Sequence, residues 1–176
     1  GEILIGCSVP DVAELLRDWE AFYLAVFKRQ VDFSGIVVPA HQAGFDRLIV
    51  VAEGMTPNCL FEACQKLFPA WRYQEELDDV KSDRTADHDY AVWVRDRVEA
   101  DEELKNLSAK NLGEREIPGI TLEERLLHEL KSFTETGNHL DIVNWTLCSG
   151  SRYPDGNVPD VDWFRVSSEL YVSWCG

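Results

Sequence analysis

The last third of the chain, residues 139–176, constrains the fold more than any other segment. It contains three short stretches of alternating character, at about 141–149, 158–164 and 169–175. Turn residues separate them, YPDG at 153–156 and the pair Ser167-Ser168. This pattern predicts a three-stranded antiparallel meander. Three tryptophans and two tyrosines among 38 residues indicate that the meander either packs into a core or forms a binding surface.

Strands and helices alternate upstream of this meander. A β-branched run in 45–52 predicts a central strand, and Thr56 caps a helix from Pro57 to Phe68. Residues 71–73 and 89–98 read as strands on either side of a polar loop at 78–89, and 102–112 as a helix. Thr121 and Glu124 form a capping box for a helix that Gly137 closes.

The order of these elements gives the fold class. From residue 45 it runs βαββαβ, followed by the last two strands of the meander, which is the order of a ferredoxin-like sandwich with an extension. We therefore expect an α+β fold, with helices packed on a single mixed or antiparallel sheet. The 176 residues suit one domain, with residues 1–43 as an N-terminal helical extension and 44–176 as the core.

An amphipathic helix is predicted in the extension, from Ser8 as N-cap to about Gln30. Its polar stripe begins with charged residues and becomes apolar near its end, so the helix has to be covered on two sides. The cover is either the rest of the domain or another subunit. The candidate subunit interface consists of Trp19, Phe22, Tyr23, Leu24 and Phe27.

Charge and motifs exclude several classes of function. With 32 acidic and 17 basic residues the net charge is −15, which disfavours nucleic acid and anionic membranes as partners. The acidic residues either serve solubility or make the protein a mimic of nucleic acid that occupies a basic partner. No apolar run approaches a membrane span of ~20 residues. The five cysteines form no CxxC pair, which favours reduced thiols and a cytoplasmic location. No motif predicts a cofactor.

Alternation along the strands suggests one candidate binding face. If the strands at 89–98, 141–149 and 169–175 share a sheet, the apolar core face holds Tyr90, Val92, Val94, Val98, Val143, Trp145, Leu147, Leu170, Val172 and Trp174. The opposite face then carries the candidate ligand-binding residues Trp93, Arg95, Arg97, Asn144, Thr146, Cys148, Tyr171 and Ser173. Aromatic rings, hydroxyls and arginines suit a small molecule or peptide, with the arginines favouring a carboxylate or phosphate. An ordinary solvated or covered face is the alternative.

No residue is predicted to be catalytic or to bind metal. Cys148 would need a base, and His139 lies roughly 30 Å away along an extended strand. Glu124 and His128 have chelating i, i+4 spacing, but they share a stripe with Lys131 and Glu135 that we expect to be solvated.

One charged residue falls on the predicted core face. Asp96 breaks the apolar alternation of its strand, so we expect it to pair with Arg47 or Arg152, or to lie exposed at the strand end.

Four long stretches carry a resemblance to known proteins. They are GFDRLIVVAEGMTP (44–57), DHDYAVWVRDRVEADEELKNLSA (87–109), IPGITLEERLLHELKSFTETGNHLDIVNWTLCSGSRYPDGNVPDVDW (117–163) and ELYVSWC (169–175). In these stretches the chain resembles a family of uncharacterised proteins from environmental bacteria, and as a whole it is similar to products of mobile integron gene cassettes. The resemblance implies no activity, cofactor or site residue, but it implies assembly into homo-oligomers.

Two functions follow as expectations. The first is an accessory protein that binds a small molecule or a partner and works as a homo-oligomer. The alternative is a hydrolase-like enzyme with its site on the polar sheet face near Cys148.

Overall fold

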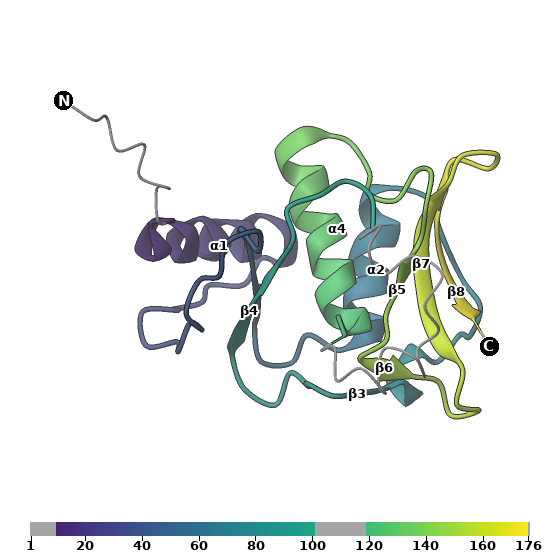
Figure 1. Ribbon diagram of the computed structural model, residues 1–176, viewed down its shortest axis with the longest axis horizontal. Coiled ribbons are helices and arrows are strands. Elements are labelled where there is room, and N and C mark those ends of the chain that lie inside the picture. The colour runs from purple at the N-terminus through teal and green to yellow at the C-terminus, as the bar shows by residue number, and fades with distance from the viewer. Residues whose placement is uncertain (1–9, 101–118, 176) are drawn as a thin grey trace.

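The α+β class and the N-terminal helix are confirmed by the computed structural model, which describes residues 10–100 and 119–175 (Figure 1). The helices are α1 (Val12–Phe27), α2 (Pro57–Leu67) and α4 (Leu122–Thr136), with a short 3-10 turn, η1, at Leu77–Asp79. The strands are β1 (Arg47–Val51), β2 (Ala70–Arg72), β3 (Lys81–Ser82), β4 (Tyr90–Val94), β5 (Thr146–Leu147), β6 (Ser151–Arg152), β7 (Val158–Phe164) and β8 (Glu169–Cys175). The predicted helix at 102–112 lies outside the described residues.

The described strands form three sheets, which corrects the prediction of a single one. β1 pairs with β4, β3 pairs with β6, and four strands form a sheet in the order β2-β8-β7-β5. β2 runs parallel to β8, and the other pairs are antiparallel. A ferredoxin-like sheet would place β4 between β1 and β2. Here β2 pairs with β8 instead, because Ala70 and Arg72 then lie opposite the buried Leu170 and Val172.

Helix α4 is the central element of the fold. In Figure 1 it stands between α1 and β4 on one side and the four-stranded sheet on the other, with α2 alongside. It packs against α2, β1 and β7. Its apolar face is fully buried and consists of Leu122, Leu126, Leu127 and Leu130. The capping box of Thr121 with Glu124 and the left-handed Gly137 (φ 73°) are both present, as predicted.

The aromatic residues of α1 pack within their own chain. The Trp19 indole donates to the carbonyl of Leu48 at 3.0 Å. The Tyr23 hydroxyl donates to the carbonyl of Val50 at 2.7 Å and accepts from the amide of Ala52 at 2.9 Å. The helix therefore shares one core with β1 on its aromatic side, whereas Ala21, Leu24 and Ala25 on the other side are exposed.

This packing corrects most of the predicted subunit interface. Trp19, Phe22 and Tyr23 are buried in their own chain, so they are not available to a second subunit. Phe27 packs against the same core, whereas Leu24 is 55% exposed.

The bounds of α1 also differ from the prediction. The helix begins after Asp11, whose carboxylate accepts from the amide of Glu14 at 3.2 Å, and Ser8 lies outside the described residues. It ends at Phe27 because Lys28 has a positive φ of 54°.

The segment 141–149 has the opposite facing to the one predicted. Only Thr146 and Leu147 pair as a strand. Val143 and Trp145, predicted as core, are 69% and 57% exposed, whereas Cys148 is fully buried. Asp141 has a positive φ, so the chain bends before the strand. The alternation of faces counted from residue 141 therefore assigns the later residues to the wrong side.

The other strands also depart from the predicted core face near their ends. β4 ends at Val94, so Val98 is exposed, and Trp174 is 44% exposed near the end of β8. The turn at 153–156 forms with Gly156 at a positive φ, but it joins β6 to β7.

Candidate functional site

The polar stripe of α4 is buried, which corrects the prediction that it is solvated. Glu123, Glu124, Arg125, His128, Glu129 and Lys131 are each at most 5% exposed, and only Glu135 near the helix end is exposed. The reason is the central place of α4, which packs against α2, β1 and β7 and contacts α1 through Lys131. A charge buried in this way needs partners. Residues whose partners are all present are therefore structural, and those with a missing partner are candidates for function.

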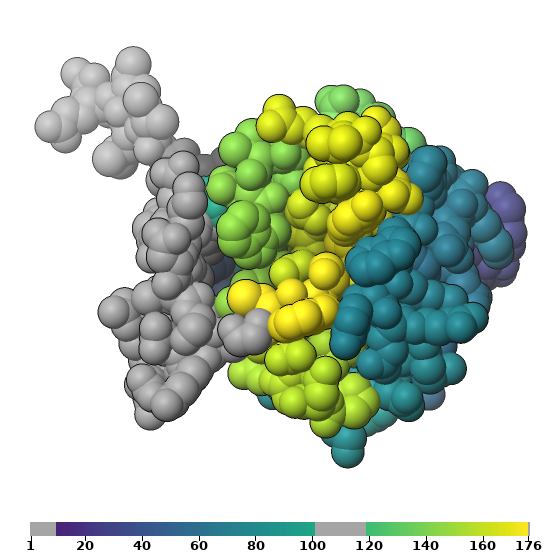
Figure 2. All heavy atoms as spheres, turned by 90° about the vertical axis from the view of Figure 1, so that its right-hand side faces the viewer, coloured from purple at the N-terminus to yellow at the C-terminus, as the bar shows by residue number. Residues whose placement is uncertain are grey.

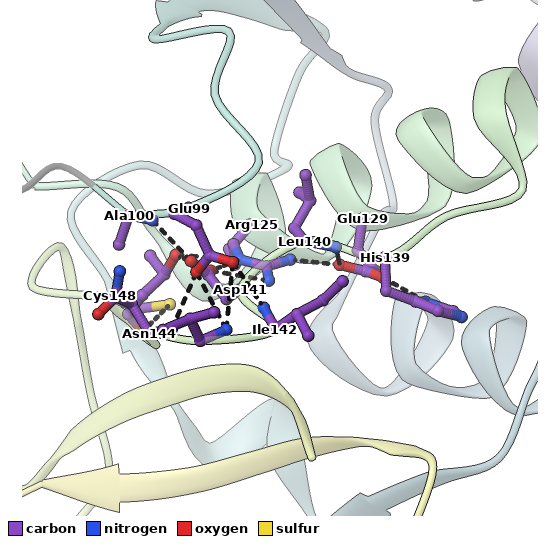
Figure 3. Close-up of polar contacts among 12 residues, drawn as sticks. Glu99, Ala100, Arg125, Glu129, His139, Leu140, Asp141, Ile142, Asn144 and Cys148 are labelled. Atoms are coloured by element: carbon purple, nitrogen blue, oxygen red, sulfur yellow. Dashed lines mark hydrogen bonds and ion pairs between the residues drawn. The ribbon is translucent and has the colours of Figure 1, made fainter. Parts of the chain in front are cut away.

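Arg125 is the centre of a buried network on α4 (Figure 3). Its guanidinium pairs with Glu129 at 3.0 Å and with Asp141 at 3.0 Å, and it also donates to the hydroxyl of Thr146 at 3.2 Å. That hydroxyl donates in turn to Asp141. The network therefore fastens the bend at Asp141 to the middle of α4.

Two further contacts extend this network. Glu129 also holds the ring of His139, with 2.8 Å between Oε1 and Nδ1. The His139 ring is stacked on Trp163, with 3.4 Å between ring centroids. The carboxylate of Glu99 accepts from the successive backbone amides of residues 142, 143 and 144 (Figure 3). Each charged group here has specific partners, so we assign the network to stability.

The N-terminal turn of α4 holds a second satisfied pair. Arg84 binds the carboxylate of Glu124 in a bidentate manner, at 2.7 and 2.8 Å, and the Tyr90 hydroxyl donates to the same group at 2.7 Å. The chain crosses itself tightly beside this turn. A Cβ on Gly119 would lie 2.6 Å from the backbone nitrogen of Gly150, so only glycine fits there.

Lys131 and Arg47 join α4 to its neighbours. Lys131 Nζ lies 2.5 Å from the carboxylate of Asp18 on α1. Arg47 on β1 pairs with Glu135 at 2.7 Å and with Asp96 at 3.3 Å. The pairing and the exposure of Asp96 agree with the sequence-based expectation.

Two side chains on α4 are incompletely satisfied within the described part of the chain. The Nε2 atom of His128 and the Oε2 atom of Glu123 are buried and have no hydrogen-bond partner there. Burial, followed by the charges of Arg125 and Arg47, lowers the pKa of His128 to about 3, which keeps its ring neutral at physiological pH. Glu123 lines a cavity to which His128 does not contribute.

The cavity beside Glu123 has a volume of about 220 Å³ and lies between the N-terminal ends of α2 and α4. Its lining residues come from the start of α2, from the segment after η1 and from α4. They are Met55, Thr56, Pro57, Asp78, Val80, Ser82, Thr85, Ala86, Asp87 and Glu123.

Glu123 is the buried carboxyl of this cavity. Its Oε1 accepts from the Ser82 hydroxyl at 3.0 Å, and the Ser82 hydroxyl contacts that of Ser151 at 2.7 Å. Burial raises the pKa of Glu123 to about 7, the Ser82 hydrogen bond offsets part of that effect, and the neighbouring charge of Glu124 adds to it. The cavity therefore holds a carboxyl that gains and loses its proton near neutral pH.

The chemistry of the cavity lining favours hydrogen-bond donors. Asp78 and Asp87 are exposed acidic residues of the lining, and the lining contains no lysine or arginine. No group of three His, Cys, Asp or Glu side chains suited to a metal ion occurs in residues 10–100 and 119–175. An ammonium or guanidinium group fits this lining because it donates several hydrogen bonds and carries the opposite charge.

The eight predicted ligand-binding residues do not share one face. Trp93 lies on β4, where its indole donates to the carbonyl of Pro39 at 2.8 Å, and the guanidinium of Arg95 stacks on the ring of Phe45. Arg97 follows β4 and is exposed. The β1-β4 sheet is separate from the sheet that contains β5 and β8.

The other five residues lie on that second sheet or beside it. Tyr171 and Ser173 are on β8, Thr146 contacts Arg125, and the amide of Asn144 donates to Glu99. Cys148 is fully buried, and burial raises the pKa of its thiol well above its usual range. A nucleophilic role for Cys148 therefore lacks the exposed, activated thiol that it requires.

Glu123 could not be recognised from the sequence, because its buried environment is formed by segments that are distant along the chain. In the sequence it is one of two adjacent acids in the first turn of a capped helix, where acids are common. Its distinct environment arises when β3 pairs with β6, because this pairing places Ser82 opposite Ser151. Both short strands were too short to recognise, and β3 lies in the predicted polar loop.

Comparison of the chain with protein-family models, with curated proteins and with solved structures returned no match. The resemblance to proteins of environmental bacteria therefore stays an expectation. Among the described residues, no helix has the length and apolar character needed to cross a lipid bilayer.

Proposed function

We propose that the protein binds a small organic cation in the cavity beside Glu123. One observation carries the proposal: Glu123 lines this cavity, and its buried Oε2 atom has no hydrogen-bond donor among the described residues. Leaving such an oxygen unsatisfied costs about 1–3 kcal/mol, and more when the group is charged. A bound ammonium or guanidinium group would supply the missing donor and neutralise the charge.

The size and charge of the site support a small ligand. A volume of about 220 Å³ lies below the roughly 300–1,000 Å³ of pockets that hold drug-sized ligands, so the site suits a smaller molecule. The net charge of −15 raises the local concentration of cations around the protein. A small amine, diamine or guanidine matches both features.

A thermal-shift screen with matched compounds tests the proposal. Ethanolamine, ethylenediamine and methylguanidine form the cationic set, and ethylene glycol and methylurea are neutral counterparts. We expect at least one cation to raise the Tm of the wild type in a saturable way, while the neutral compounds do not. The effect should be lost in Glu123→Gln and retained in Glu62→Gln, which changes an exposed carboxylate on α2. Equal shifts in both variants would contradict the proposal.

An acid–base enzyme is the second candidate for the same cavity. It is favoured by the titration of Glu123 near neutral pH and by the hydroxyl of Ser82, 3.0 Å from its carboxylate. Turnover of a bound amine derivative that disappears in Glu123→Gln, while binding persists, would establish it. The earlier hydrolase-like hypothesis centred on Cys148 has no support from the buried thiol.

Assembly into a homo-oligomer and a cytoplasmic location remain parts of the proposal. The resemblance to gene-cassette products supports assembly, and the exposed Leu24 is the one predicted interface residue that is still well exposed. Reduced thiols at Cys59, Cys64 and Cys148 fit a cytoplasmic location. Light scattering at micromolar concentration tests assembly, and a strict monomer would contradict it.

A further inference from the structure

The outer face of the four-stranded sheet carries an aromatic ladder with acidic residues beside it. Pairing places Trp71 of β2 next to Tyr171 of β8, and Tyr171 opposite Asp162 of β7. The Trp71 and Tyr171 rings are 5.1 Å apart, and the Tyr171 and Phe164 rings are stacked at 4.7 Å. Trp71 and Phe164 are 43% and 37% exposed. Three strands therefore present one row of rings.

The same register assigns ten residues to this outer face, of which Val158 is buried and Cys175 is the last residue of β8. The other eight are Trp71, Leu147, Asp160, Asp162, Phe164, Glu169, Tyr171 and Ser173. Three are aromatic, three are acidic and none is basic. The opposite face holds the buried Val161, Leu170 and Val172, so it is the one that packs on the helices. Figure 2 looks onto the outer side, where β7 and β8 lie against the segment that contains β2.

The two aspartates form no ion pair with any described residue, although the charge of Arg125 offsets part of the rise in the pKa of Asp162. Within residues 10–100 and 119–175, neither Asp160 nor Asp162 forms a side-chain hydrogen bond or an ion pair, although both are half-buried. Burial is the main cause that raises the pKa of Asp160 to about 6, and the charge of Asp162 adds to the effect. The buried acids of α4 differ from these aspartates, because Glu123 accepts from Ser82, Glu124 pairs with Arg84 and Glu129 pairs with Arg125.

We propose that this outer face docks an extended, arginine-bearing peptide segment of a partner protein. A guanidinium plane stacks on aromatic rings and pairs with a carboxylate at the same time, which a neutral ligand cannot do. Strands lie about 4.8 Å apart, so the row of rings spans roughly 10 Å. Two alternate side chains of an extended peptide are about 6.7 Å apart, so both fit within that length. The cavity beside Glu123 contains none of these eight residues, so the two sites are separate.

Fluorescence anisotropy with a labelled peptide tests the docking. The probe contains three arginines that alternate with serine, and a second probe has citrulline in place of arginine. We expect saturable binding of the arginine probe only. Asp162→Asn and Trp71→Ala should each weaken it about threefold to tenfold, the range expected for a lost ion pair or cation–π contact. Because asparagine has the same shape as aspartate, we expect the Asp162→Asn variant to fold like the wild type.

Matched controls separate a defined site from the general negative field. Glu62→Gln removes the same charge as Asp162→Asn but lies on α2, and Val37→Ala truncates an 86% exposed apolar side chain elsewhere. Both should bind the probe within about twofold of the wild type. Equal weakening by Glu62→Gln and Asp162→Asn would overturn the proposal. So would a dimer that Trp71→Ala dissociates, because the occupant would then be a second copy of the chain.

Discussion

Replacement of Glu123 by glutamine should stabilise the protein at alkaline pH and do little at acid pH. Burial raises the pKa of this carboxyl from its ordinary value of 4.5 to about 7, so the folded state holds a proton that the unfolded chain releases. Its contribution to stability is therefore complete below about pH 4.5 and is lost as the pH rises through 7. The full difference corresponds to about 3 kcal/mol.

Glutamine keeps the shape of the side chain and has no such dependence on pH. Between about pH 5 and about pH 8, the unfolding free energy of Glu123→Gln should rise relative to wild type by about 2–3 kcal/mol. Asp160, whose pKa is also raised, and His128, whose pKa is lowered, are present in both proteins, so their effects cancel in the difference.

Urea unfolding of both proteins across this pH range measures the difference directly. Glu62→Gln, the exposed control on α2, should show no trend. A difference between Glu123→Gln and wild type that stays constant with pH would refute the assignment of the raised pKa to Glu123.

Three further predictions address the core. Tyr23→Phe should cost about 1–3 kcal/mol in urea unfolding, because a buried carbonyl and a buried amide beside β1 lose their partner; no change would contradict this. Arg125→Met should cost about 3–5 kcal/mol and lower the Tm sharply, since two buried carboxylates lose their cation; a Tm close to wild type would contradict this. Alkylation mapped by mass spectrometry should modify Cys148 only after denaturation, whereas labelling of native Cys148 as fast as the half-buried Cys59 would contradict its burial.

Much of the local structure could be predicted from the sequence because its signals are local. The capping box of Thr121, the Pro57 at the start of α2 and the β-branched run of β1 each depend on near neighbours in the chain. The same holds for the hairpin of β7 and β8, whose alternation and turn are adjacent in sequence. These elements established the α+β class without tertiary information.

The arrangement of the elements could not be predicted in the same way. The polar stripe of α4 has the periodicity of a solvated helix, yet Arg125 and Glu129 are buried because partners from distant segments satisfy them. The bend at Asp141 depends on Glu99 and Arg125, and it reversed the facing of the residues that follow. Local patterns do not encode such long-range pairs. For the same reason only Tyr171 and Ser173 of the predicted ligand face lie on the sheet surface that we now propose for docking.

The central claim, that Glu123 receives a cation in its cavity, is tested most directly by titration of the carboxyl itself. A ¹³C-NMR difference spectrum between wild type and Glu123→Gln, with labelled glutamate, isolates the Glu123 carboxyl signal. Alone it should titrate near pH 7. With saturating ethylenediamine, or whichever cation of the screen stabilises the wild type, its pKa should fall by at least about one unit because the bound cation favours the carboxylate. A Glu123 pKa that does not move when the cation is bound would contradict the account.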